Sequence, residues 1–153
     1  MALVVTQAVS AATKQPNVIV VFIDDLGWTD LGCYGSKFYE TPHIDQLAKQ
    51  GVMFTRAYSS CNVCSPTRAS LMTGKYPQRV AFTSWLNPGK PSGANSAATH
   101  LPASETTIGE AFQQAGYRTG YIGKWHVGSK KIGMPKQHGF DWQMATAKHG
   151  LPG

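Results

Sequence analysis

Apolar residues along the 153-residue chain occur in short runs, some with the spacing of strands and some with the spacing of helices. The run that begins at Asn17 is rich in β-branched residues and ends in two carboxylates and a turn, which predicts a strand buried on both faces. Thr41 as N-cap and Pro42 at the first helical position predict a helix through about Gln50, ended by Gly51. The apolar residues of this helix are expected in the core: Ile44, Leu47 and Ala48.

Further along the chain, strand and helix patterns continue to alternate. Residues 52–58 are predicted to form a strand, and residues 65–66 open a helix that places Cys64 at its N-terminus, where the helix dipole favours an anion. Residues 107–114 begin with a capping-box pattern and predict another helix, followed by a strand over 117–124. This alternation predicts an α/β fold with a mainly parallel sheet, whose catalytic groups gather at the carboxyl ends of the strands.

Composition and charge limit the classes of partner. The net charge is +6 and the sequence pI is about 9.3, which favours acidic partners. Nucleic acid is the first partner to consider, but the cationic residues are scattered and match no nucleic-acid motif. An anionic small or polymeric substrate fits the charge as well, and a solvated basic surface fits it nearly as well. Residues 87–105 are rich in Pro, Gly and Ser and predict a long loop.

The chain is long enough for one domain with its own core, predicted over 16–153. Residues 1–15 are Ala- and Val-rich and are predicted to be an N-terminal arm or the remnant of a signal peptide, which favours a periplasmic or secreted location. No stretch is long and apolar enough to predict a membrane span.

Two pairs of polar residues are candidates for chemistry. Asp24 and Asp25 follow the first apolar run, where adjacent carboxylates repel each other unless a divalent cation such as Ca²⁺ or Mg²⁺ compensates them. The alternative is that Asp24 caps a turn and Asp25 is solvated. Lys124 and His126 are two residues apart, so on a strand they would face one pocket; the alternative is a snorkelling lysine and a surface histidine.

The cysteines suggest a different function, thiol redox chemistry. The three are Cys33, Cys61 and Cys64, and the last two form a C-x-x-C pair of the kind found in thiol redox proteins. A zinc site is less favoured, because no second pair of suitably spaced Cys or His residues follows.

The C-x-P-x-R motif at 64–68, followed by Thr73 and Gly74, resembles the signature of the type I, formylglycine-dependent sulfatases. The segment 116–126, with its Gly-Lys-x-His ending, is similar to the second signature of that family. Shorter motifs occur in the family's order: Thr41-Pro42-His43-Ile44-Asp45, Ala57-Tyr58, Lys75-Tyr76-Pro77 and Gly139-Phe140-Asp141. The resemblance, which covers about 17–141, identifies the chain as the N-terminal portion of an arylsulfatase-like protein. It implies an alkaline-phosphatase-like α/β fold, with a mainly parallel sheet flanked by helices.

The resemblance also implies a chemistry, the hydrolysis of an aryl or carbohydrate sulfate ester. A formylglycine-generating enzyme would oxidise Cys64 to Cα-formylglycine, whose hydrate carries one hydroxyl that attacks sulfur and a second that expels sulfate. Arg68 would hold these hydroxyls, Lys124 would contact sulfate, and His126 would accept the proton that drives sulfate release. The metal ligands would be Asp24, Asp25 and Cys64, and the metal Ca²⁺, with Mg²⁺ as the alternative.

The sequence departs from that family in its length, because sulfatases run to several hundred residues. Their other metal ligands and the acid for the leaving alcohol come later in the chain. His138 and His149 are expected to be solvated loop residues rather than that acid. The family's central sheet also takes strands from that later part of the chain, so exposed sheet edges and exposed apolar surface are expected. Three alternatives stay open: a non-catalytic fragment, a thiol redox protein and a related metal-dependent phosphoesterase.

Overall fold

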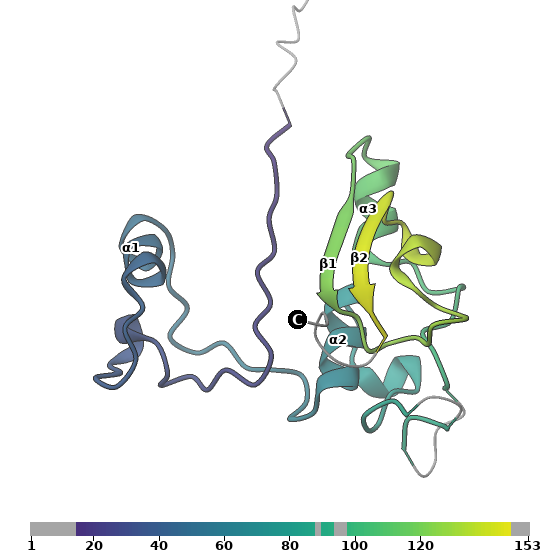
Figure 1. The fold of residues 1–153 in the computed structure, drawn as a ribbon, viewed down its shortest axis with the longest axis horizontal. Helices are drawn as coiled ribbons and strands as arrows, with labels where there is room; N and C mark the ends of the chain where they lie inside the picture. Colours follow the sequence, from purple (N-terminus) through teal and green to yellow (C-terminus); the bar gives the residue numbers. More distant parts are fainter. Residues whose placement is uncertain (1–14, 88–89, 94–97, 148–153) are drawn as a thin grey trace, which may run out of the picture. The chain divides into compact units, whose positions relative to one another are not determined.

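The computed structural model describes residues 15–87, 90–93 and 98–147, in two compact units that divide after Gly51 (Figure 1). The predicted N-terminal arm or signal remnant at 1–15 lies, apart from its last residue, outside the described residues. A single domain over 16–153 stays a prediction, and each unit is described by itself.

In the first unit, a short turn of 3-10 helix is fastened to the start of an α-helix. The elements are η1 (Gly32–Tyr34) and α1 (Pro42–Gln50). The Gly32 amide donates to Thr41 Oγ1 at 2.8 Å, and the Cys33 amide donates to Asp45 Oδ1 at 2.7 Å. The Thr41 hydroxyl also donates to Asp45 Oδ1 at 3.0 Å, so one carboxylate in the first turn of α1 holds both elements. The predicted helix and its end at Gly51 are confirmed.

The predicted strands at the start of the chain and at 52–58 are wrong: neither segment pairs as a strand in the described part of the chain. The apolar side chains of the first segment are exposed, Ile19 to 85 %, as is Val52 of the second, to 83 %. An apolar run favours burial, but a strand also needs a neighbouring backbone to pair with its hydrogen-bonding groups. The expectation that α1 contributes to the core is also wrong, because none of its residues is buried. The expected exposed apolar surface is confirmed.

The second unit combines helices with a parallel pair of strands, and Figure 1 shows the two strands running side by side. Its elements are α2 (Cys64–Thr73), η2 (Pro77–Val80), α3 (Ile108–Gln114), β1 (Gly120–Lys124), η3 (Pro135–His138) and β2 (Trp142–Thr146). In the parallel register Gly120 lies opposite Trp142 and Lys124 lies opposite Thr146. The prediction of an α/β fold with parallel strands is therefore confirmed, although β1 starts three residues later than expected.

Local sequence signals account for the helix ends of this unit. Gly74 ends α2 with a left-handed φ of 66°, a conformation that costs glycine little. The capping box of α3 is formed: the Thr107 amide donates to Glu110 Oε2 at 2.7 Å, and the Glu110 amide donates to Thr107 Oγ1 at 3.3 Å. The Thr107 hydroxyl donates in turn to the carbonyl of His138 at 2.7 Å, which fastens α3 to η3.

The core of the second unit is centred on an aromatic cluster. The buried apolar side chains are Ala69, Met72, Val80, Phe82, Leu86, Leu101, Trp125, Val127 and Phe140. Trp125 is 1 % exposed and packs edge-on against Tyr121, with ring centroids 4.9 Å apart. Its indole N–H donates to the carbonyl of Gly133. Because Trp125 follows directly on β1, its burial fixes the backbone of the neighbouring residues Lys124 and His126.

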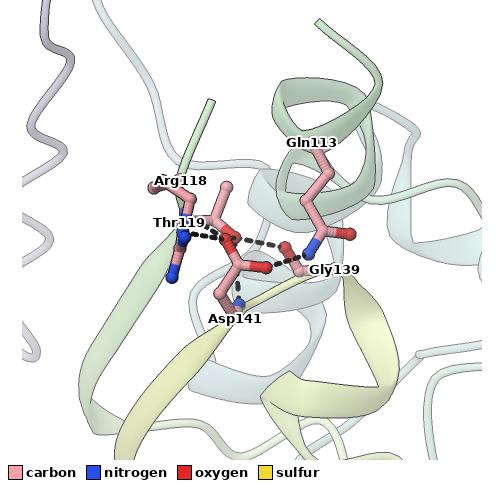
Figure 2. A network of polar contacts seen from close by, with 5 residues as sticks. All are labelled: Gln113, Arg118, Thr119, Gly139 and Asp141. Carbon is pink, nitrogen blue, oxygen red and sulfur yellow. Dashed lines mark hydrogen bonds and ion pairs between the residues drawn. The ribbon is translucent and has the colours of Figure 1, made fainter. Parts of the chain in front are cut away.

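A polar network joins the starts of β1 and β2 to α3 (Figure 2). The Asp141 carboxylate accepts the Thr119 backbone N–H at 2.8 Å and the Gln113 side chain at 2.7 Å, while Arg118 lies 3.6 Å away. The Thr119 hydroxyl donates to the carbonyl of Gly139 at 2.7 Å. The Thr119 backbone N–H, followed by the Gln113 side chain, lowers the pKa of the Asp141 carboxyl below its usual range. Asp141 is thus a structural residue of this unit.

His138 is buried, and the expectation that it is a solvated loop residue is wrong. It is 1 % exposed, it packs on Trp125 with ring centroids 5.8 Å apart, and neither ring nitrogen has a hydrogen-bond partner among the described residues. Burial lowers the pKa of the His138 imidazole below 6.5, with the Glu110 carboxylate opposing this effect and His100 adding to it. Burial therefore favours the neutral form of the His138 imidazole. The other loop histidine, His149, lies outside the described residues.

We expect the second unit to lose stability as the pH falls below about 6.5, because the unfolded chain then binds a proton that buried His138 resists. The loss continues until the pH reaches the lower pKa of the folded state. The variant His138→Phe keeps an aromatic ring in the core and should remove this part of the pH dependence. Thermal midpoints between about pH 5 and 7.5 measure the effect. The variant His43→Gln, at an exposed histidine, is the control, and an undiminished slope in His138→Phe would contradict the assignment.

Candidate functional site

Cys64 and His126 come from distant parts of the sequence and meet at one point of the second unit. Cys64 is the first residue of α2 and is half-buried, and His126 follows β1 by two residues and is 5 % exposed. The Cys64 Sγ lies 3.2 Å from the His126 Nδ1. The structure therefore brings together two of the four predicted catalytic residues, with a titratable base in contact with the predicted nucleophile.

The imidazole of His126 is oriented by a backbone carbonyl. Its Nε2 lies 2.9 Å from the carbonyl oxygen of Leu86. Because a carbonyl oxygen can only accept, Nε2 carries the proton, and in the neutral ring Nδ1 presents its lone pair to Cys64.

The reason for expecting Lys124 and His126 on one side of a strand is wrong. The strand β1 ends at Lys124, and His126 adopts a left-handed φ of 57°, which is uncommon for a residue other than glycine. The His126 amide donates to the carbonyl of Ala147 at 2.9 Å, and Trp125 is anchored in the core, so the surrounding structure holds this conformation. His126 reaches Cys64 through a backbone bend rather than through strand alternation.

Arg68 links α2 to the end of β1. Arg68 is 5 % exposed, and its Nη1 donates to the carbonyl of Lys124 at 2.6 Å. The hydroxyl of Tyr121 donates to the same carbonyl, also at 2.6 Å. Arg68 lies one helical turn after Cys64, so a buried cation lies close to the N-terminus of α2. Through its bond to the Lys124 carbonyl, Arg68 also fixes the backbone that carries the Lys124 side chain. All four predicted catalytic residues therefore belong to one region, α2 and the segment that ends β1.

The segment before α2 is held by hydroxyl groups. The carbonyl of Cys61 accepts from Ser59 Oγ at 2.6 Å and from Thr67 Oγ1 at 2.8 Å, which fixes the approach to the first turn of the helix. Cys61 and Cys64 are both free thiols in the structure.

The predicted metal ligands belong to different units of the structure. Asp24 and Asp25 form an exposed turn in the first unit, where Asp25 has a left-handed φ of 56°, whereas Cys64 belongs to the second unit. No group of three or more His, Cys, Asp or Glu residues that could hold a metal occurs among the described residues. Carboxylate oxygens are the type of ligand that Ca²⁺ prefers. Two carboxylates are nevertheless too few for an ion that takes six to eight oxygen ligands. We therefore assign no chemical step to a metal.

Sequence reasoning missed two groups of this site, Ser65 and Leu86. The Ser65 side chain is 0 % exposed, and its hydroxyl accepts the Leu86 amide at 2.8 Å. Leu86 acts through its backbone, which no sequence motif marks. Ser65 occupies a variable position of the C-x-P-x-R motif, so only its place between Cys64 and a proline could have drawn attention to it.

None of the helices in the described residues is long and apolar enough to cross a membrane.

Three kinds of comparison agree on what the chain resembles. The family model described as Sulfatase matches residues 16–150. Human steryl-sulfatase is 40 % identical over 142 residues, which cover 89 % of this chain and 24 % of that protein. Human N-acetylgalactosamine-6-sulfatase is 38 % identical over 133 residues, which cover 86 % of this chain and 26 % of that protein. The chain thus spans about a quarter of the length of these relatives.

Solved structures give the same result. PsFucS1 sulfatase from Pseudoalteromonas sp. matches with a TM-score of 0.70 and 35 % identity, over 82 % of this chain and 25 % of that chain. Ps i-CgsB matches with a TM-score of 0.69 and 38 % identity, over 80 % of this chain and 26 % of that chain. The likeness confirms the predicted fold class, the alkaline-phosphatase-like α/β fold.

Proposed function

The chain belongs to the sulfatase family, and from this premise we propose that its protein hydrolyses sulfate esters with a nucleophile made from Cys64. The observation that carries the proposal is the 3.2 Å contact between Cys64 Sγ, at the N-terminus of α2, and His126 Nδ1. Both residues lie in motifs that resemble the signatures of formylglycine-dependent sulfatases. A helix N-terminus favours the negative charge that develops on such a nucleophile or on bound sulfate.

We propose that Cys64 is oxidised to Cα-formylglycine by a formylglycine-generating enzyme. The hydrated aldehyde would supply one hydroxyl for attack on sulfur and a second whose deprotonation expels sulfate. His126 is suited to take that proton, because its Nδ1 lone pair faces residue 64 while Nε2 donates to Leu86.

The two cationic residues have complementary roles in this proposal. Arg68, buried one turn after Cys64, offsets negative charge on the nucleophile and orients its hydroxyls. Its bond to the carbonyl of Lys124 fixes the backbone from which the Lys124 ammonium contacts the sulfate group. The positive net charge of +6 agrees with an anionic substrate.

Asp24 and Asp25 would contribute two oxygen ligands to a Ca²⁺ ion, or to Mg²⁺, with the oxidised Cys64 as a third ligand. We further propose that the substrate is an aryl or carbohydrate sulfate, a class consistent with the names of the relatives, and that the protein is periplasmic or secreted.

The test is peptide mass spectrometry of the protein from its native host, combined with an assay of sulfate release from an aryl sulfate. We expect an aldehyde at Cys64 in a fraction of the molecules. Cys61 in the same peptide is an internal control and should keep its thiol. A Cys64 thiol that stays unmodified in a host shown to mature other sulfatases would overturn the proposal. A reversible Cys61–Cys64 disulfide without aldehyde would favour a thiol redox protein instead.

A further inference from the structure

A chain of two hydrogen bonds connects the buried hydroxyl of Ser65 to the imidazole of His126. The Leu86 amide donates to Ser65 Oγ at 2.8 Å, and the Leu86 carbonyl accepts from His126 Nε2 at 2.9 Å. Each of the three residues is at most 5 % exposed, so water does not compete for these groups. The backbone of Leu86 therefore links the two side chains: its amide bonds Ser65 and its carbonyl bonds His126. We call this arrangement the relay.

We propose that Ser65 is a positioning residue, which through the backbone of Leu86 sets the tautomer and direction of the His126 ring. The inference rests on the proposed function, because its consequence is that Nδ1 faces residue 64 as a proton acceptor.

Three observations support the relay over a merely structural hydroxyl. Ser65 is adjacent to Cys64 on α2, so the residue whose proton His126 would accept and the residue that would orient His126 lie in the same helical turn. Leu86 lies in a segment outside the helices and strands, where neither ladder nor helix bonds hold its carbonyl in place. The bent backbone at His126 leaves the ring to be directed by its own hydrogen bonds, because a left-handed residue does not follow the side-chain directions of β1.

The experiment uses ¹⁵N NMR of the histidine rings in the full 153-residue chain. In the unaltered chain the neutral His126 ring should carry its proton on Nε2. The variant Ser65→Ala removes the acceptor of the Leu86 amide, and we expect the ratio of Nε2–H to Nδ1–H tautomers to fall about three- to tenfold, the factor that one ordinary hydrogen bond provides. The variant Ser65→Thr keeps a hydroxyl and should restore the ratio.

The matched control is Ser70→Ala, which removes a hydroxyl from the same helix; Ser70 Oγ donates to the carbonyl of Lys75 at 2.6 Å, away from the relay. An unchanged ratio in Ser65→Ala, or an equal change in Ser70→Ala, would overturn the inference. If Ser65→Ala does not fold, the unaltered chain decides: a proton on Nε2 that exchanges slowly with water supports the relay, and a proton on Nδ1 refutes it.

Failure of this inference is distinguishable from failure of the proposed function. The tautomer is measured without turnover, and the aldehyde at Cys64 is measured by mass spectrometry on the same preparations. If Ser65→Ala shifts the tautomer ratio but no aldehyde is found at Cys64, the relay is supported and the proposed sulfatase chemistry is refuted. If the aldehyde is found but Ser65→Ala leaves the tautomer ratio unchanged, the sulfatase chemistry is supported and the role of Ser65 is refuted.

Discussion

Replacing Cys64 by alanine is expected to abolish sulfate-ester hydrolysis in an active preparation of the protein, with a rate loss of about four to six orders of magnitude. The loss is this large because alanine offers no group that can be oxidised to the nucleophile. His126 then has no proton to accept, since its Nδ1 lies 3.2 Å from the Cys64 sulfur that is removed. Sulfate release from an aryl sulfate at saturating substrate measures the effect.

Cys61→Ala is the matched control for this experiment. The contacts that hold the segment before α2 are made to the carbonyl of Cys61, by Ser59 and Thr67, and alanine keeps that carbonyl. We therefore expect Cys61→Ala to retain nearly all of the activity. Equal losses in the two variants would mean that the C-x-x-C pair, and not Cys64 alone, carries the chemistry.

The parts of the fold that sequence predicts well are those decided by local interactions. Thr41, Pro42 and Gly51 mark the bounds of α1, and Thr107 with Glu110 forms the capping box that starts α3. These signals succeed because the groups that satisfy a helix end lie within a few residues of it. The placement of Cys64 at the first position of α2 follows from the same kind of signal, and it is the basis of the candidate site.

The predictions that failed depend on partners distant in sequence. The run 17–23 has the composition of a buried strand, yet its side chains are exposed and no strand pairs with it among the described residues. His138 failed in the opposite direction: its neighbouring glycine suggested a loop, but packing on Trp125 buries it. Composition describes what a segment would prefer, whereas pairing and burial depend on which other segments reach it.

The candidate site lies between these two cases. The motifs predict that Cys64 and His126 belong to one site, and the structure places them in contact. What the sequence does not contain is the backbone conformation of His126 or the relay through Leu86, because both arise from tertiary structure. The metal set of Asp24, Asp25 and Cys64 stays a prediction.

Replacing Trp125 by alanine is expected to destabilise the second unit by about 3–5 kcal/mol, the usual cost of removing a large aromatic side chain from a core. Trp125 is 1 % exposed and contacts the rings of Tyr121, His138 and Phe140, so the cavity would open at the centre of the aromatic cluster. The Gly133 carbonyl would also lose its indole donor. Urea unfolding of the 153-residue chain, followed by circular dichroism, measures the change.

The control for this substitution is Trp85→Ala, because Trp85 lies in the same unit and is 52 % exposed. Its loss should cost about 1 kcal/mol or less. Similar costs for the two variants would contradict the central role of Trp125. The comparison also bears on function, because Trp125 stands between Lys124 and His126 and fixes the bend that directs the imidazole. A variant that stays folded at low temperature should therefore show a mixed His126 tautomer, which would connect the packing of the core to the chemistry of the site.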